Sequence, residues 1–232
     1  MTVRIGVITF PGSLDDRDAQ RAIRIAGAEP VALWHQDSTL KGVDVVILPG
    51  GFSYGDYLRS GAIARFSPIM DAVRDHAADG GGVIGICNGF QILCEAGLLP
   101  GALVRNGGLH YVSRPVDVRI ERSDSICTRA YHEGDVIRIP VAHGDGRFVA
   151  SPEELAAIED GNQVVLRYAG GRMLDAEGNP NEATADIAGI CNAAGTVVGM
   201  MPHPERLAHP ALGSEAGIGV FQSLVLSPAP AA

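Results

Sequence analysis

The sequence predicts an α/β fold, in which an open, mostly parallel twisted sheet is covered by helices on both faces. In roughly the first hundred residues, short apolar runs alternate with amphipathic segments of helix length. This order is typical of doubly wound sheets with right-handed crossovers. The apolar runs are nearly continuous, as expected for parallel strands that are covered on both sides. Many of the 30 glycines stand at the ends of these runs, where tight turns need them.

The first half of the chain supplies four expected strands and three expected helices. The clearest helix is amphipathic, with Ala19, Ala22 and Ile23 on one stripe and acidic residues in its first turn. The third strand ends at a Pro-Gly-Gly sequence. The expected strands are residues 3–10, 31–34, 43–48 and 82–86, and the expected helices are residues 15–27, 63–78 and 89–96.

The second half predicts short strands with little helix between them. A helix over 218–226 is expected to close the fold, the polar loops around 170–184 to be mobile, and 227–232 to be a frayed tail. Because no internal repeat or linker interrupts the chain, residues 1–232 are expected to form a single domain. The extra strands are expected at 115–121, 136–140, 164–168, 186–191 and 197–201.

Composition excludes several classes of function. A net charge of −9 argues against a nucleic-acid-binding protein, which normally carries a basic face. No apolar stretch approaches the roughly 20 residues that span a bilayer, and the N-terminal residues lack a signal-peptide pattern. The four cysteines have no CxxC spacing, so the sequence predicts neither a metal site nor a disulfide framework. We therefore expect a cytoplasmic protein.

The sequence Gly85-Ile86-Cys87-Asn88-Gly89 lies between a predicted buried strand and a predicted helix. It has the glycine–x–nucleophile–x–glycine pattern of a nucleophile elbow, with cysteine in the nucleophile position. Such a turn lifts the sulfur above the C-terminal edge of the sheet, and the helix N-terminus favours the reactive thiolate. The alternative is a buried structural cysteine, but both glycines and the strand–helix context favour a nucleophile.

A cysteine nucleophile needs a general base. Of the seven histidines, only His203 has a tight chemical context, since it stands in Pro202-His203-Pro204-Glu205 directly after an apolar run. The prolines are expected to exclude helix and to hold the segment extended. Residues two apart in an extended chain point the same way, so Glu205 can orient His203 as the third member of a triad. The alternative is a proline-stiffened surface loop.

A glycine-rich loop, Pro49-Gly50-Gly51-Phe52, follows the third predicted strand. Acyl transfer needs backbone N–H groups aimed at the developing oxyanion, and the backbone amides of Gly51 and Asn88 are the candidates. A phosphate-binding loop is the competing interpretation, but the segment contains no GxxxxGK[ST] sequence and no lysine. A plain turn is the other.

Together these motifs resemble the class I, or triad, glutamine amidotransferases. More narrowly, five blocks resemble the glutaminase subunits of phosphoribosylformylglycinamidine synthase, a family of de novo purine synthesis. The blocks follow one another along nearly the whole chain, and the second is long and specific, since other amidotransferases share only its glycines. They are residues 10–13 (FPGS), 49–64 (PGGFSYGDYLRSGAIA), 85–93 (GICNGFQIL), 142–148 (AHGDGRF) and 199–206 (GMMPHPER).

The resemblance implies a class I amidotransferase fold with a flavodoxin-like core and a glutamine pocket beside the elbow. It makes Gly50 and Gln91 the substrate-binding residues, with Gln91 holding the α-amino and carboxylate end of glutamine. Two departures concern loops rather than the triad. Asp145 stands where the family usually has glutamate, and Glu182 begins a Glu-Ala pair where Gly-Ser is usual.

The resemblance also implies partners. The ammonia released from glutamine would pass to a synthetase subunit that binds ATP and Mg²⁺, with a small accessory subunit in the same complex. The chain has no obvious ATP-binding segment, so it is expected to hold no cofactor and no metal itself. It should have low activity alone and higher activity in the complex.

Two other functions compete with this one. A DJ-1/PfpI-like cysteine hydrolase would share the strand–cysteine–helix elbow but would not require the late His203-Pro204-Glu205. An inactive amidotransferase-like scaffold would usually have lost its nucleophile or base, whereas Cys87 and His203 are both present.

Overall fold

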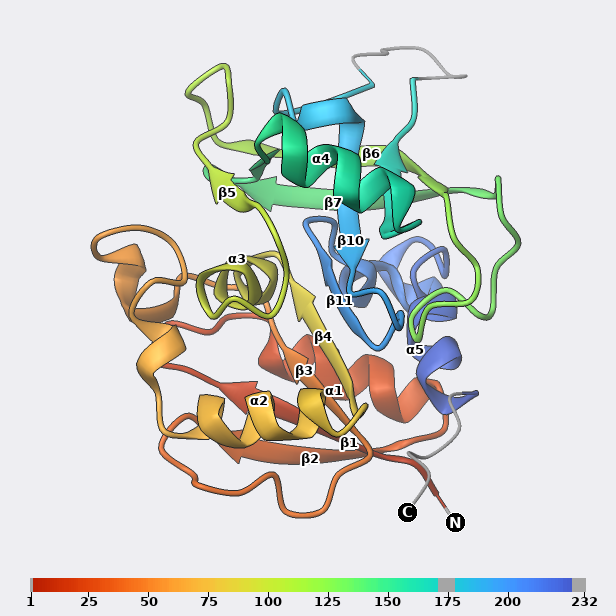
Figure 1. Ribbon diagram of the computed structural model, residues 1–232. Coiled ribbons are helices and arrows are strands. Elements are labelled where there is room, and N and C mark those ends of the chain that lie inside the picture. The colour runs from red at the N-terminus through yellow and green to blue at the C-terminus, as the bar shows by residue number, and fades with distance from the viewer. Residues whose placement is uncertain (1, 171–177, 227–232) are drawn as a thin grey trace.

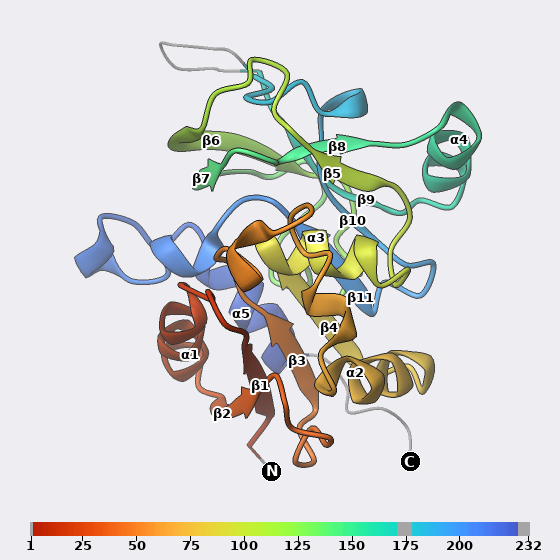
Figure 2. The same ribbon diagram turned by 90° about the vertical axis from the view of Figure 1, so that its left-hand side faces the viewer.

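The computed structural model describes residues 2–170 and 178–226. The strands of these segments are β1 Arg4–Thr9, β2 Glu29–Trp34, β3 Val45–Leu48, β4 Gly82–Ile86, β5 Ala102–Val104, β6 Val112–Ile120, β7 Val136–His143, β8 Arg147–Val149, β9 Val164–Tyr168, β10 Ile187–Cys191 and β11 Val197–Met200. Nine of them form one sheet in the order β2-β1-β3-β4-β11-β10-β9-β6-β7 (Figure 1), and β5 pairs with β8 in a separate ribbon (Figure 2).

Helices cover both faces of the parallel part of the sheet, as the sequence predicts. The α-helices are α1 Asp16–Ile25, α2 Ile69–Ala78, α3 Asn88–Glu95, α4 Pro152–Asp160 and α5 Ile218–Val225. Helices α1 and α5 contact each other on one side of the parallel strands, while α2 and α3 lie on the other side (Figure 2). Within the described segments, no helix is both long enough and apolar enough to cross a bilayer.

The sheet is parallel in its first half and antiparallel in its second. Strands β2, β1, β3, β4 and β11 pair in parallel, and β3 and β4 are buried along their whole length. The remaining strands, β10, β9, β6 and β7, extend the same sheet through antiparallel pairs. The α/β class is therefore confirmed. Four of the five short strands predicted for the second half form the antiparallel side of the sheet, while the fifth, β11, joins the parallel part next to β4.

Two helix predictions need correction. The helix expected over 63–78 begins only at Ile69, because Ser67 precedes Pro68 and is extended (φ −63°, ψ 139°), as residues before proline tend to be. The second half also contains α4, where no helix was predicted. Its N-terminus has a complete capping box, in which Ser151 and Glu154 each accept a hydrogen bond from the other's backbone N–H. Residues 171–177 of the polar loop and the 227–232 tail lie outside the described residues.

Strand order brings three loops to one edge of the sheet. Strand β4 lies between β3 and β11 and is parallel to both, with Gly85 beside Leu48 and Ile86 beside Met200. The C-terminal ends of three neighbouring strands therefore meet, and ligands usually bind at this edge of open α/β sheets. The glycine loop, the cysteine turn and the histidine turn follow these three ends.

Candidate active site

Cys87 occupies a strained turn between β4 and α3. Its backbone has φ 50° and ψ −103°, which is uncommon for a residue with a side chain and is typical of functional sites. The flanking glycines make the turn possible. A Cβ on Gly89 would lie 1.9 Å from the Leu48 carbonyl oxygen, and one on Gly85 would lie 2.5 Å from the Gly89 backbone. The predicted elbow is therefore present.

His203 and Glu205 form a buried pair after β11. The Nδ1 atom of His203 lies 2.5 Å from Oε1 of Glu205, and both residues are 1% exposed. Burial lowers the pKa of His203, but the charges of Glu205 and Cys87 outweigh it and raise that pKa to about 10. The Nε2 atom of His203 has no hydrogen-bond partner among the described residues. This edge of the ring is thus free to exchange a proton with the nearby sulfur.

The route by which Glu205 reaches His203 differs from the prediction. Residues Pro204–Leu207 form a 3₁₀ turn, whereas the prolines were expected to keep the segment extended. Proline is favoured at the first position of a helical turn, because its missing N–H would have no partner there. The expected contact between Glu205 and His203 exists, but it is formed by a tight turn instead of an extended segment.

Asp15 joins this pair from the start of α1. Its Oδ2 lies 3.5 Å from His203 Nδ1, so the side chains of Asp15, His203 and Glu205 have the spacing of a metal site. Two contacts favour proton transfer instead. Arg206 donates hydrogen bonds to both carboxylate oxygens of Asp15, and His203 Nδ1 is already bonded to Glu205.

The glycine loop after β3 is held in place by the turn after β1. Phe52 N–H donates to the Gly12 carbonyl at 2.9 Å, and Leu14 N–H donates to the Gly50 carbonyl at 3.1 Å. Gly51 has φ 147°, and a Cβ there would lie 2.6 Å from the Gly12 carbonyl oxygen. No described residue accepts a hydrogen bond from Gly51 N–H, so this donor is available to a ligand.

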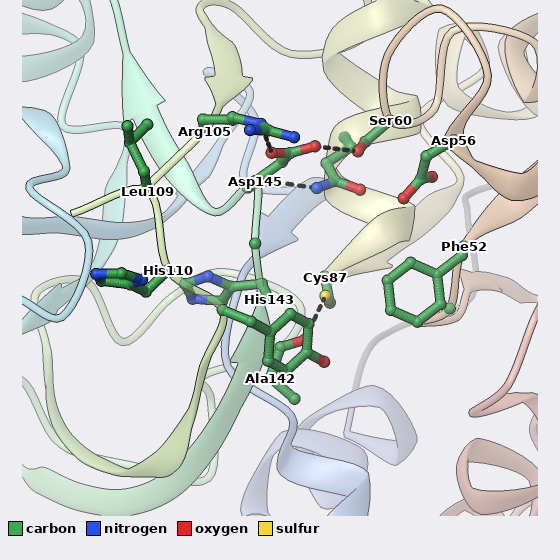
Figure 3. Close-up of a pocket in the computed structure, with 14 residues that line it drawn as sticks. Phe52, Asp56, Ser60, Cys87, Arg105, Leu109, His110, Ala142, His143 and Asp145 are labelled. Carbon is green, nitrogen blue, oxygen red and sulfur yellow. Dashed lines mark hydrogen bonds and ion pairs between the residues drawn. The ribbon is translucent and has the colours of Figure 1, made fainter. Parts of the chain in front are cut away.

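A cavity of about 270 Å³ opens over Cys87. Figure 3 shows the sulfur between Phe52 on one side and His143 on the other. The candidates Gly51, Cys87 and Gln91 line the cavity, whereas Gly50, Asn88, His203 and Glu205 are not among its lining residues. The residues on the wall are Gly51, Phe52, Asp56, Ser60, Cys87, Gln91, Arg105, Leu109, His110, Tyr111, Ala142, His143, Gly144 and Asp145.

A chain of hydrogen bonds fixes the cavity wall. Asn88 Oδ1 accepts from Ser53 N–H at 3.1 Å, and Asn88 Nδ2 donates to Gln91 Oε1 at 2.9 Å. Gln91 Nε2 donates to the Asp145 carbonyl at 2.6 Å. The Gln91 amide keeps one further donor hydrogen and one acceptor lone pair. It therefore ties the elbow helix to the loop after β7 and still has capacity for a ligand.

The cavity also carries charged residues that are not among the predicted site residues. Ser60 donates to the Asp145 carboxylate at 2.9 Å, and the Arg105 guanidinium lies 3.8 Å from the same carboxylate. The pKa of Asp56 is raised to about 6. Burial is the largest cause, the hydrogen bond from Ser60 opposes it, and the charge of Asp145 adds to the rise. Asp56 and Ser60 both lie in the 49–64 block, so the motif in that block was the sequence signal that could have identified them.

His143 lies on the cavity wall as a neutral ring. Burial, with the charge of His203, lowers the pKa of His143 to about 4. Asn106 accepts hydrogen bonds from Gly146 N–H at 3.0 Å and pairs with His143 Nδ1 at 3.1 Å, and it donates to the carbonyls of His110 and His143. Asn106 thus organises the far wall of the cavity, and no sequence motif marked it.

Comparison with known proteins agrees with this geometry. Residues 2–216 match the family of CobB/CobQ-like glutamine amidotransferase domains. Phosphoribosylformylglycinamidine synthase subunit PurQ of Frankia casuarinae is 58% identical over 96% of this chain and 93% of its own. The subunit of the same name from Streptomyces avermitilis is 56% identical over 97% of both chains.

Solved structures give the same relationship. A chain in the structure of PurLQS from Thermotoga maritima superposes with a TM-score of 0.86 at 42% identity, over 97% of this chain and 99% of that one. A second glutamine amidotransferase from Thermotoga maritima has a TM-score of 0.60 at 15% identity, a level that supports the shared fold alone.

Proposed function

The chain belongs to the family of CobB/CobQ-like glutamine amidotransferase domains, and we propose that it is the glutaminase subunit of a phosphoribosylformylglycinamidine synthase. It hydrolyses glutamine to glutamate and ammonia and supplies the ammonia for purine biosynthesis. The observation that carries the proposal is the strained Cys87 turn on the cavity floor, next to the buried His203–Glu205 pair.

The first half-reaction forms a thioester. The Cys87 thiolate attacks the side-chain amide carbon of glutamine, and the backbone N–H groups of Gly51 and Asn88 stabilise the oxyanion. His203 Nε2 then donates its proton to the departing nitrogen, which leaves as ammonia while the γ-glutamyl thioester forms. Glu205 stabilises the imidazolium that this step requires and fixes its orientation.

The second half-reaction releases glutamate. Neutral His203 takes a proton from a water molecule as the hydroxyl oxygen attacks the thioester carbon. The carbon–sulfur bond breaks, and the Cys87 thiolate and imidazolium are restored for the next cycle. Both halves use the same Nε2 atom, which has no competing hydrogen-bond partner among the described residues.

The charges on the cavity wall suit a free amino acid. Asp56 and Asp145 can accept hydrogen bonds from an α-ammonium group, and Arg105 can pair with an α-carboxylate. Gln91 has one donor and one acceptor left for the same end of the substrate. Gly50 lies beside His203 and Asp15 instead of on the wall, so its role is in shaping the catalytic group.

The ammonia is consumed on other polypeptides. The relatives are named as subunits of a synthase, which supports assembly with a synthetase subunit and a small accessory subunit. ATP and Mg²⁺ would bind to the synthetase, which converts the amide of its substrate to an amidine. The chain described here then needs no cofactor of its own.

The test is glutamate release from glutamine by the purified chain, alone and with its synthetase subunit. We expect Cys87→Ala to abolish release without changing the thermal unfolding temperature by more than a few degrees. Cys94→Ala, which changes a second cysteine in α3, is the matched control and should leave release intact. Release that persists in Cys87→Ala would refute the proposal, and turnover of other amides or esters but not glutamine would favour a cysteine hydrolase.

A further inference from the structure

A second carboxylate lies against the catalytic histidine. Asp15 is 4% exposed, and its Oδ2 atom lies 3.5 Å from His203 Nδ1, the atom that also bonds to Glu205. Asp15 belongs to the turn after β1, whereas Glu205 stands two residues after the histidine in sequence. The imidazole is thus bordered by acidic groups from two unrelated parts of the chain.

Asp15 is held firmly in this place. Arg206 donates from Nε at 3.2 Å and from Nη2 at 2.9 Å to Oδ1, and from Nη2 at 3.0 Å to Oδ2. The backbone N–H of Asp15 donates to the Gly50 carbonyl at 3.2 Å. Charge-assisted, bidentate contacts of this kind fix orientation as well as charge. The guanidinium also pairs with the carboxylate, so the buried Asp15 has an opposite charge in direct contact.

Gly50 provides the space for this arrangement. A Cβ on Gly50 would lie 2.4 Å from Asp15 Oδ2 and 2.7 Å from His203 Cε1. The backbone of Gly50 does not have the positive φ that only glycine adopts easily. Glycine is therefore needed here for close approach of two side chains and not for an unusual conformation.

We propose that Asp15 is a positioning residue for His203, held by Arg206 and admitted by the missing side chain of Gly50. This inference rests on the proposed glutaminase function. Asp15 supports the imidazolium form of His203 on the Nδ1 edge and leaves Nε2 facing the sulfur. Without it, the Arg206 guanidinium, whose Nε is 4.0 Å from Glu205 Oε1, would compete with His203 for that carboxylate.

Several charged or titratable groups surround the imidazole besides Asp15, which lies 3.5 Å from Nδ1. Cys87 and Glu205 raise the pKa of His203, while His143 is a neutral ring on the adjacent wall. The groups that face this centre are Asp15 before α1, Cys87 before α3, Tyr111 before β6, His143 at the end of β7, and Glu205 and Arg206 after β11.

The experiment compares Asp15→Asn with Asp16→Asn in the full chain bound to its synthetase subunit. Asp16 is a matched control because it is the neighbouring acid and bonds to Thr9 Oγ1 instead of facing His203. We expect Asp15→Asn to lower kcat several-fold near pH 10 and little at pH 7.5, since loss of a charge 3.5 Å away lowers the pKa of His203 by about one unit and the ring then loses its proton at lower pH. KM should change less than about twofold, because Asp15 does not line the cavity.

The pH profile separates positioning from a general structural role. With Asp15→Asn the alkaline limb of kcat should move to lower pH by about one unit, because the imidazolium of His203 loses support. Asp15→Glu, which keeps the charge, should restore most of that limb. Gly50→Ala should lower kcat and leave KM nearly unchanged, since it displaces the same two side chains.

The inference is overturned if Asp15→Asn matches Asp16→Asn in kcat and in the alkaline limb. It is also overturned if kcat falls with no shift of that limb. NMR titration of the His203 imidazole, compared between wild type and Asp15→Asn, gives the same answer without turnover. The titration therefore tests the effect of Asp15 on His203 even if the glutamate-release assay of wild type and Cys87→Ala shows that the proposed glutaminase function is wrong.

Discussion

Changing Glu205 to glutamine tests the role of the buried acid in the triad. Glutamine has nearly the same shape, so its Oε1 can still accept the 2.5 Å hydrogen bond from His203 Nδ1 while the charge is lost. In the wild type, the charges of Glu205 and Cys87 raise the pKa of His203 to about 10 against the lowering effect of burial. Nearly all of the ring is therefore protonated at neutral pH.

The expected magnitude follows from that balance. When the largest favourable charge is removed and burial remains, the pKa of His203 should fall to its ordinary value of about 6.5 or below. At pH 7.5 the protonated fraction then drops to about one tenth or less, which alone costs about tenfold in kcat. Loss of orientation adds to this cost, since the corresponding change in a serine-protease triad costs about 10⁴. We expect a loss of about 10² to 10⁴.

The assay is the initial rate of glutamate release by the complex with its synthetase subunit, from pH 6 to 10. KM should stay within about threefold of wild type, because Glu205 does not line the cavity. Glu159→Gln, which changes a glutamate on α4 that pairs with Arg167, is the control and should behave like wild type. A Glu205→Gln kcat within threefold of wild type, or an unmoved alkaline limb, would refute this account of the triad.

Three further predictions concern the elbow, the cavity and the far wall. Gly89→Ala should lower the free energy of unfolding by at least about 3 kcal/mol, seen as a fall of about 6 to 12 °C in Tm, because its Cβ would lie 1.9 Å from the Leu48 carbonyl oxygen. Gly108→Ala, whose Cβ would make only an ordinary contact with His110 at 3.8 Å, should change Tm little, and equal effects would contradict the steric argument. The KM of wild type for glutamine should rise as pH falls from 7.5 to 5, because Asp56, with a pKa of about 6, takes up a proton. Asp56→Asn should have a high KM that changes little with pH. If KM depends on pH in the same way in both proteins, Asp56 does not contact the ammonium group. The pKa of His143 is about 4 when folded and about 6.5 when unfolded, so the unfolded state binds more protons below pH 6.5 and stability is lost as pH falls towards 4. Urea unfolding should therefore show that wild type loses about 2 kcal/mol more than His143→Gln between pH 7.5 and 5, and identical losses would contradict a neutral buried ring.

The sequence predicted the parallel half of the fold well because its strands are buried on both faces. Strand β4 is an unbroken apolar run and was placed at its observed bounds. Errors occurred where local signals were weaker or were overlooked. The break before α2 depends on one proline, and α4 has only one fully buried residue, Ile158, so its apolar stripe is weak even though Ser151 begins a clear capping box.

The site divides in the same way between local and long-range information. Cys87 is marked by its own flanking glycines, and Glu205 stands two residues from His203, so short motifs were enough to predict these three residues. The contact between Asp15 and Arg206 joins residues 191 positions apart, and spacing along the chain carries no information about it. Asn106 makes its contacts from an irregular loop, where no periodicity restricts the position of a side chain.

Close contacts connect the turn after β1, the glycine loop after β3 and His203 into one catalytic site. The turn after β1 braces Gly51 through Gly12 and also delivers Asp15 to the histidine. Gly50 admits Asp15 and the His203 ring, while Gly51 leaves an N–H group free over the cavity. One short segment therefore connects the oxyanion donor to the proton-transfer group. A displacement of the 10–15 turn should impair both at once, although none of its residues lines the cavity wall.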